Sequence, residues 1–521
     1  MPLPKHTILD VFPLELLEHI VKTDPSIGNL RQLRLVSKAM KDIVDPLAFS
    51  STTISFSDIE ENLRTQLESM ASGTSPNSLW TTRLFIQDLV QLDGPESDES
   101  VDNYNAVLAL QKSKLIPAIA ALKEVKCVHF NLSTREPYVE VIAALARLSK
   151  LRTLRVSVSE FKGQKVAAFS RISNLEEIQL DSKWSSGFQK AARRLILASL
   201  PTLKKLYLEQ FPQSNAMELR KLILPENFAE SSPPSPLTSL CLFGPNEIAV
   251  DQSCARLLRN LTHLDIRNLN VIVAHQFDSN ASFWDALSSS NTHLHSLLAY
   301  PLTPSLIRYL LSYAGLSSLR IESDHEVIEY IYQPEGVANL AQTLFASVLP
   351  RHCATLKRLS LVGLNYRFWA LTEATLNEVV SCHALERLDV IYHFPREMQD
   401  NLLFASETPF IDMSRLLSRL LNGENLPHLH TIALAPARKL DNAFGKAVIN
   451  VKDSQAFLAA WQRLVCQVDL TRLSHSKVLR NPHLKLYVAS SGANEGVDPD
   501  FAFDIESGHF AVDPAQDWNE S

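Results

Sequence analysis

The stretch Leu151-Arg152-Thr153-Leu154-Arg155-Val156 decides the fold, because its pattern L-x-x-L-x-L recurs along much of the 521-residue chain. Valine or isoleucine replaces leucine in some copies, and the copy at Leu294 ends in alanine. Successive copies begin as little as 22 residues apart (Leu294 to Leu316) and as much as 44 residues apart (Leu385 to Leu429). The copies begin at Leu151, Leu175, Leu203, Leu237, Leu261, Leu294, Leu316, Leu356, Leu385 and Leu429.

Such a pattern is typical of a short strand, because alternate strand residues point to opposite faces and the leucines can stack on those of the next copy. Several spacings match the period of roughly 20–29 residues that leucine-rich repeats show. Earlier candidate strands are Val125-x-x-Val128-x-Phe130 and residues 84–86, and the segments 164–170, 187–199, 217–224 and 338–349 have helical spacing. The sequence therefore predicts an irregular leucine-rich-repeat-like α/β solenoid.

The x positions of the repeats are expected to point away from the leucines and to form an exposed row. Aromatic and arginine side chains are the usual anchors of protein interfaces. Most of the row could also be ordinary exposed strand residues. The row comprises Arg155, Ser157, Gln179, Asp181, Tyr207, Glu209, Cys241, Phe243, Asp265, Arg267, Leu298, Tyr300, Arg320, Glu322, Ser360, Asp389 and Ala433. The candidate contacts to a protein substrate are Tyr207, Phe243, Arg267, Tyr300 and Arg320.

Residues 12–49 predict two helices in front of the repeats. Pro13 suits the first position of a helix, and Asn29 can cap a second helix. Two helices in about forty residues cannot close a core of their own. Their apolar stripes must be covered by the rest of the chain or by the helices of a partner. The stripes comprise Leu16, Leu17, Ile20 and Val21, then Leu30, Leu33, Val36, Met40, Ile43 and Val44.

This segment resembles the F-box of substrate receptors in SCF-type cullin–RING ubiquitin ligases. The resemblance lies in Phe12-Pro13-Leu14-Glu15-Leu16-Leu17, then Ile20, then Leu33-Arg34-Leu35-Val36-Ser37-Lys38, then Ile43-Val44-Asp45-Pro46-Leu47. Phe12 and Met40 depart from the commonest residues of the family. The resemblance implies binding to a Skp-family adaptor and, through it, to a cullin scaffold. The residues at adaptor-facing positions are Pro13, Leu16, Leu17, Ile20, Leu33, Val36 and Ile43.

The resemblance, the repeat pattern and the composition together divide the chain into four segments. They are an F-box-like segment (1–50), a connector with helices, loops and the first repeat-like units (51–125), the repeat array (126–490) and an acidic C-terminal tail (491–521). The tail interleaves aromatic residues with acidic ones, so it can dock on the last repeat or remain free.

Composition and motifs exclude several functional classes. A net charge of −7 and a pI near 6.2 speak against nucleic acid as the main partner. No apolar run is long enough to span a membrane, and the unpaired cysteines suit the reducing cytoplasm or nucleus. The sequence has no P-loop, G-x-G-x-x-G, G-x-S-x-G or H-E-x-x-H motif, so neither an enzyme nor a cofactor is predicted. The paired histidines, such as His293 and His295, are interpreted as exposed or capping residues.

The functional hypothesis is a non-catalytic substrate-recognition subunit of an SCF-type ubiquitin ligase, with a protein substrate that the sequence does not identify. Two alternatives remain open. One is an F-box protein that pairs with the adaptor alone as a scaffold. The other is a leucine-rich-repeat interaction protein outside ubiquitination, whose N-terminal helices only cap the repeats.

Overall fold

The computed structural model describes a set of ranges that together cover most of the repeats. They are residues 30, 32–56, 61–87, 109–132, 138–158, 166–182, 186–210, 217–225, 234–244, 248–267, 278, 280–322, 334–361, 369, 371–392, 413–420, 425–436, 485–488, 500–504 and 509–513. The chain forms two compact units. Unit 1 comprises Met1–Ser214 and Leu219–Leu237, and unit 2 comprises Asn215–Glu218 and Thr238–Ser521.

Unit 1 begins with a small helical cluster that includes α3 (Lys38–Ala48). The predicted single helix after Asn29 is wrong, because the chain turns at residues 34–36 and starts α3 anew. Ser37 lies in extended backbone and its hydroxyl accepts a hydrogen bond from the Met40 amide at 3.1 Å. This hydroxyl caps the new helix, and a cap of this kind favours a fresh helix start over continuation. The cluster buries Leu30, Met40, Val44 and Ala48, with Leu33, Ile43, Leu47 and Phe49 packed against them.

An ion pair connects the turn at residues 34–36 to helix α3. The Nε of Arg34 donates to Oδ1 of the buried Asp45 at 2.8 Å, and its guanidinium lies 4.8 Å from the centroid of the Phe49 ring. Arg34→Ala leaves Asp45 buried without its cation, and we expect it to destabilise the cluster by about 2 kcal/mol. Amide hydrogen exchange along α3 measures this loss. Lys38→Ala, at an exposed position of the same helix, is the matched control and should leave the exchange rates unchanged.

The sheet of unit 1 is parallel and its strands follow chain order. Facing residues of neighbouring strands stay in register, so that Leu84, Val128, Leu154, Ile178 and Leu206 form one buried row. This row confirms the predicted stacking of the repeat leucines. The strands are β1 (Ser51–Ser55), β2 (Arg83–Gln87), β3 (Cys127–Leu132), β4 (Thr153–Val158), β5 (Glu177–Ser182) and β6 (Lys205–Gln210).

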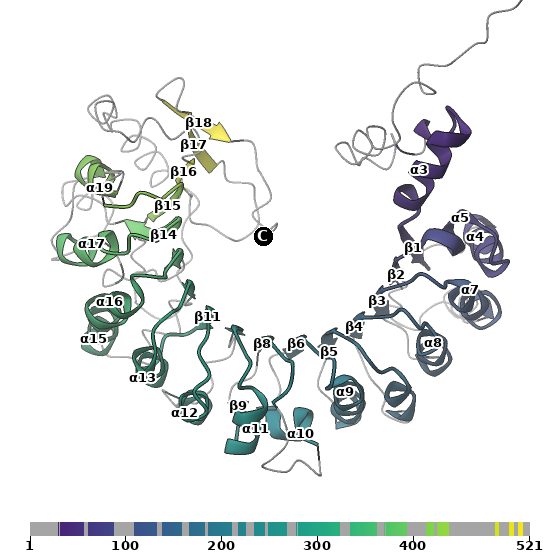
Figure 1. Ribbon diagram of the computed structural model, residues 1–521, viewed down its shortest axis with the longest axis horizontal. Helices are drawn as coiled ribbons and strands as arrows, with labels where there is room; N and C mark the ends of the chain where they lie inside the picture. Colours follow the sequence, from purple (N-terminus) through teal and green to yellow (C-terminus); the bar gives the residue numbers. More distant parts are fainter. Residues whose placement is uncertain are drawn as a thin grey trace, which may run out of the picture. The chain divides into compact units, whose positions relative to one another are not determined.

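Helices cover one face of this sheet, on the outer side of the strands in Figure 1. The predicted helical segment 187–199 lies within α9, whereas the described part of segment 164–170 belongs to a 3-10 helix, Val166–Arg171. These elements are α4 (Glu61–Ala71), α5 (Pro76–Trp80), η2 (Gln111–Leu115), α7 (Ile116–Ala121), α8 (Tyr138–Leu145), η3 (Val166–Arg171), α9 (Ser186–Ser199) and α10 (Leu219–Ile223).

Unit 2 repeats the same design. Leu240, Leu264, Leu297, Leu319 and Leu359 face one another in register, and all are buried. The parallel strands are β8 (Ser239–Phe243), β10 (His263–Arg267), β11 (Ser296–Tyr300), β12 (Ser318–Ile321), β13 (Arg358–Ser360), β14 (Arg387–Tyr392), β15 (Thr431–Pro436) and β16 (Lys485–Val488). Two antiparallel strands from the C-terminal segment, β17 (Asp500–Asp504) and β18 (His509–Asp513), extend the sheet beyond β16. A separate small sheet pairs β7 (Met217–Glu218) with β9 (Ile248–Ala249).

The helical layer of unit 2 lies on one side of its strands (Figure 1). Its elements are α11 (Gln252–Leu257), α12 (Ala281–Ser289), α13 (Pro304–Ser312), α15 (Pro334–Thr343), η4 (Leu344–Val348), α16 (Leu349–His352), α17 (Glu373–Val380) and α19 (Met413–Leu420). Both units are therefore irregular leucine-rich-repeat-like α/β solenoids, as the sequence predicts.

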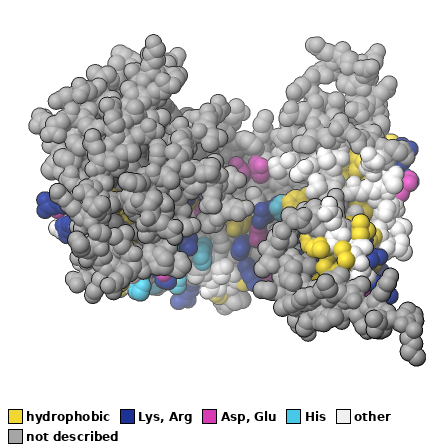
Figure 2. Space-filling model, turned by 90° about the horizontal axis from the view of Figure 1, so that it is seen from above, with side chains coloured by type: hydrophobic (Ala, Val, Ile, Leu, Met, Phe, Trp, Pro, Cys, Tyr) yellow, Lys and Arg dark blue, Asp and Glu magenta, His cyan; other side chains and the backbone are white. Residues whose placement is uncertain are grey.

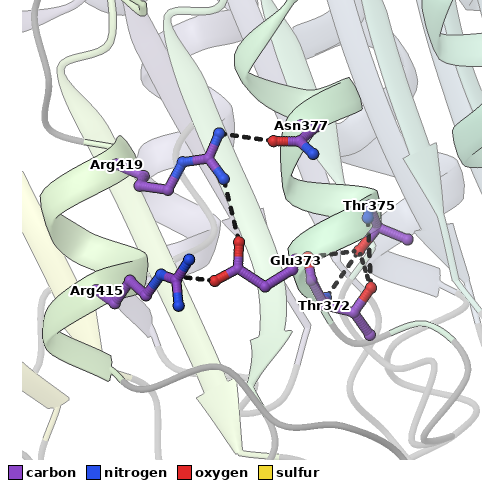
Figure 3. A network of polar contacts seen from close by, with 6 residues as sticks. All are labelled: Thr372, Glu373, Thr375, Asn377, Arg415 and Arg419. Atoms are coloured by element: carbon purple, nitrogen blue, oxygen red, sulfur yellow. Dashed lines mark hydrogen bonds and ion pairs between the residues drawn. The ribbon is translucent and has the colours of Figure 1, made fainter.

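A polar network joins the last two of these helices (Figure 3). Glu373, at the start of α17, accepts from Arg419 at 3.1 Å and pairs with the Nε of Arg415 at 2.7 Å. Arg419 also donates to Oδ1 of Asn377 at 2.6 Å. The network thus links α19 to α17 of the preceding repeat.

Candidate functional site

Each unit has a sheet face that lies opposite its helices, and we call it the open face. Along β4 and β5 every second residue is buried under the helices, and the intervening residues are half-buried on the open face. Along β8 and β10 the outermost open-face residues, Phe243 and Arg267, face each other directly in the register. The predicted orientation of the x positions is therefore confirmed for these strands.

On unit 2 the open face carries a cluster around Arg267. Its Nε donates to Oδ1 of Asp265 at 3.1 Å and its Nη2 donates to Oδ2 at 3.2 Å. The guanidinium carbon lies 4.8 Å from the centroid of the Phe243 ring, a cation–π contact. Glu322 lies 4.0 Å from Nε of Arg267 and 2.7 Å from Nη2 of Arg320. Three strands thus hold an aromatic ring and two arginines in fixed positions without folding them into the core.

The electrostatics of this cluster are set by partial burial. Burial raises the pKa of the Asp265 carboxyl, and the adjacent Arg267 opposes that rise. Because Asp265 and Glu322 flank Arg267, its charge is largely balanced within the cluster. The cluster therefore suits a partner with mixed polar and aromatic groups better than a polyanion.

Some predicted open-face residues are less accessible than expected. Tyr300 is only 9% exposed, which corrects its assignment as an exposed contact residue. The side chains of Arg267 and Glu322, on either side of its strand, approach to 4.0 Å and so reach over it. Asp389 is covered similarly, because Nε of Arg387 donates to both of its carboxylate oxygens at 3.0 Å. The other buried members of the predicted row are Cys241, Ser360 and Ala433.

On unit 1 the open face combines rings and charges that the sequence-based list mostly missed. The rings of Phe85 and His129 lie 4.5 Å apart on β2 and β3. Burial lowers the pKa of His129 and the cation of Arg155 lowers it further, so the ring is uncharged at neutral pH. Only Tyr207, on β6, was a predicted contact residue. The pattern Val125-x-x-Val128-x-Phe130 does place His129 at an x position, which is the signal that could have found it.

No group of three or more histidine, cysteine or acidic side chains suited to a metal ion occurs among the described residues. His293 instead stacks on Tyr313 with ring centroids 5.2 Å apart, while His295 is exposed. Within the ranges given above, no helix has the length and apolarity needed to cross a membrane.

The predicted adaptor-facing residues fall into three groups. Pro13, Leu16, Leu17 and Ile20 lie outside the described residues. Leu33 and Ile43 are half-buried against the N-terminal cluster. Val36 is 58% exposed, and its neighbour Leu35 is 81% exposed. Leu79 and Trp80 of α5 are also exposed, and Figure 2 shows uncovered hydrophobic side chains on the part of unit 1 that carries the first helices.

Comparisons with known proteins give distant likenesses only. No family model matches the chain, and no curated protein matches it. An internalin from Listeria monocytogenes is 15% identical with a TM-score of 0.28, over 61% of this chain and 71% of the internalin. A leucine-rich-repeat protein of Leptospira interrogans is 15% identical with a TM-score of 0.31, over 61% of this chain and 68% of that protein. TLR13, in a complex with ssRNA13, is 13% identical with a TM-score of 0.29, over 69% of this chain and 51% of TLR13. These likenesses assign no role to any residue of this chain.

Proposed function

We propose that the chain is a non-catalytic substrate-recognition subunit of an SCF-type ubiquitin ligase. Its F-box-like segment would bind a Skp-family adaptor and thereby a cullin scaffold, and its open faces would bind the protein substrate. The observation that carries the proposal is the exposure of Val36 and Leu35 within a segment whose sequence resembles the F-box. Exposed large apolar side chains that adjoin one another mark sites of protein association.

The open faces supply the second half of the proposal. Phe243, Arg267 and Arg320 are an aromatic ring and two guanidinium groups held on neighbouring strands, and such residues dominate the energetics of protein interfaces. The chain would contribute no chemistry of its own. Holding a substrate beside the ligase raises the effective concentration of its lysines at the site of ubiquitin transfer. Such a subunit would act in the cytoplasm or the nucleus.

A second candidate is a repeat-based interaction protein outside ubiquitination. One observation favours it: Leu33 and Ile43, which match adaptor-facing positions, pack against the buried cluster of Leu30, Met40 and Val44. In this alternative the N-terminal helices stabilise the first repeat and bind nothing else.

Affinity purification with mass spectrometry separates the two candidates. We expect the intact chain to capture adaptor, cullin and substrate, and the chain without residues 1–50 to capture substrate alone. The double variant Phe243→Ala and Arg267→Ala should show the reverse, retaining adaptor and cullin while losing substrate. If the intact chain captures neither adaptor nor cullin, the ligase role is wrong and the second candidate stands.

A further inference from the structure

We propose that the open face of unit 1 binds an extended peptide that carries an acidic and a basic side chain four residues apart. The inference rests on the proposed function, in which the open faces recognise a protein substrate, and it assigns the chemistry of that substrate. Two oppositely charged groups on this face carry it. The cationic group is Arg83 and Arg155 with the rings of Phe85 and His129, and the anionic group is Asp181 and Glu209.

The cationic group has more positive than negative charge. Arg83 is exposed and makes no ion pair with any of the residues that the structure describes. Arg155 lies 3.1 Å from Glu177, but Lys205 approaches the same carboxylate at 3.9 Å. Two cations therefore share the Glu177 carboxylate, and Arg83 adds a third cation with no ion pair among the described residues. The positive charges of Arg83 and Arg155 both lower the pKa of His129, so the three side chains interact electrostatically.

Arg155 is also incompletely hydrogen-bonded. Its Nε is buried and has no hydrogen-bond partner in the described part of the chain, although its Nη2 donates to Glu177. A buried unpaired donor is costly, whereas the Arg155 side chain as a whole is 43% exposed. A carboxylate arriving from solvent can draw the guanidinium outward and complete its hydrogen bonds.

In the anionic group, Asp181 is incompletely hydrogen-bonded. Oδ2 of Asp181 accepts from the Ser157 hydroxyl at 2.9 Å, but Oδ1 has no hydrogen-bond partner within the described ranges. Burial raises the pKa of the Glu209 carboxyl, and repulsion from Asp181 raises it further. Asp181 and Glu209 also face each other in the register of β5 and β6, so their like charges repel across the two strands. A lysine or arginine side chain placed between them relieves that repulsion.

The geometry of the sheet sets the spacing. Neighbouring strands lie about 4.8 Å apart, and the cationic group is centred on β3 while the anionic group is centred between β5 and β6. The centres of the two groups are therefore about 12 Å apart, measured across the strands. An extended chain rises about 3.3 Å per residue and presents alternate side chains to one side, so residues i and i+4 span about 13 Å and face the same way. A polyanion such as nucleic acid would meet the carboxylates, which favours a peptide.

An array of ten-residue peptides tests the inference with the full-length chain. Each peptide has glutamate and lysine in an otherwise serine–alanine sequence, at separations from one to six residues and in both orders. We expect binding to peak at a separation of four. In Arg155→Ala the peptide with glutamate should bind no better than one with glutamine, and in Asp181→Asn lysine should lose its advantage. Each change should weaken the best peptide about tenfold. Arg152→Ala, at an exposed strand end, is the matched control.

Reversing the charge of Arg155 gives the most specific test of the cationic group. Arg155→Glu should prefer peptides in which lysine replaces the glutamate. Binding without any dependence on separation, an unchanged preference in both variants, or no binding above a scrambled peptide would each overturn the inference. Failure of adaptor capture would instead overturn the ligase role and leave the array result unaffected. Array binding could instead be lost only in the double variant Phe243→Ala and Arg267→Ala, which changes the open face of unit 2. That result would reject the peptide site on unit 1 and keep the open face of unit 2 as the recognition surface.

Discussion

Replacing Val36 with aspartate is expected to abolish adaptor capture without lowering the thermal stability of the chain. Val36 is 58% exposed, so the fold tolerates a charge there. In the proposed complex, the same side chain would be buried against the helices of a Skp-family adaptor. Burying an unpaired carboxylate in an apolar interface costs several kcal/mol, so the affinity should fall about 100-fold or more. Biolayer interferometry against purified adaptor measures the affinity, and differential scanning calorimetry measures the stability.

Leu79→Asp is the matched control for this experiment. Leu79 is an exposed leucine on α5, after the F-box-like segment, and receives the same change from apolar to charged. We expect it to keep adaptor affinity. Equal losses in both variants would point to a general effect of charge on this part of unit 1. Full adaptor binding by Val36→Asp would show that the exposed turn of the N-terminal cluster is not the adaptor contact.

The repeat fold could be predicted because its signal is local and recurrent. Leucines at fixed spacing within each strand decide which residues are buried, and Leu154, Leu240 and Leu319 all lie where the pattern puts them. Strand β1 was missed because Ser51–Ser55 buries Thr52 and Ile54 and contains no leucine. The turn at residues 34–36 was missed because the apolar spacing runs through it, whereas the Ser37 cap competes with that spacing.

The site was harder to predict, because alternation gives the direction of a side chain but not what covers it. Tyr300 points to the open face in the pattern, yet it is only 9% exposed, and the side chains of Arg267 on β10 and Glu322 just after β12 approach each other across its strand. Arg387 and Asp389 are two residues apart on β14 and neutralise each other. Such pairings depend on rotamers and on neighbouring repeats whose spacing along the chain is irregular. An exposed charge without an ion pair among the described residues, such as Arg83, can be recognised only once these pairings are known.

A buried histidine in unit 2 shows the same dependence on distant partners. His352, at the end of α16, is 1% exposed. Its Nδ1 accepts from the Leu316 amide at 3.2 Å and its Nε2 donates to the Leu310 carbonyl at 3.0 Å. Leu310 lies in α13 and Leu316 begins the next L-x-x-L-x-L copy, so this ring joins α16 to both segments. Nothing in the L-x-x-L-x-L pattern marks the position, because the sequence separations are 36 and 42 residues.

Replacing His352 with alanine is expected to destabilise unit 2 by about 3–5 kcal/mol. The change leaves two buried backbone groups unpaired and opens a cavity beside the ring of Tyr313, whose centroid lies 5.2 Å away. Chemical denaturation followed by hydrogen exchange at the Leu316 amide measures the loss locally. His295→Ala removes an exposed histidine and is the matched control. A loss below about 1 kcal/mol would show that the repeats do not depend on this ring.

The same ring should make unit 2 sensitive to acid. Burial lowers the pKa of His352 from its ordinary 6.5, with a further decrease from Arg351 and an opposing contribution from the Leu310 carbonyl. The unfolded chain therefore takes up this proton at a higher pH than the folded chain does. The stability from this group is complete above pH 6.5 and declines as the pH falls below it, by at most about 1.4 kcal/mol per pH unit.

Denaturation of wild type and His352→Gln is measured between pH 7.5 and 5, roughly the range in which a histidine titrates. The comparison separates the contribution of His352 from that of His129, whose pKa is lowered in the same direction. Because glutamine does not titrate, the variant should be less stable at neutral pH and have a shallower slope, and parallel slopes would show that protonation of His352 does not limit the fold in acid.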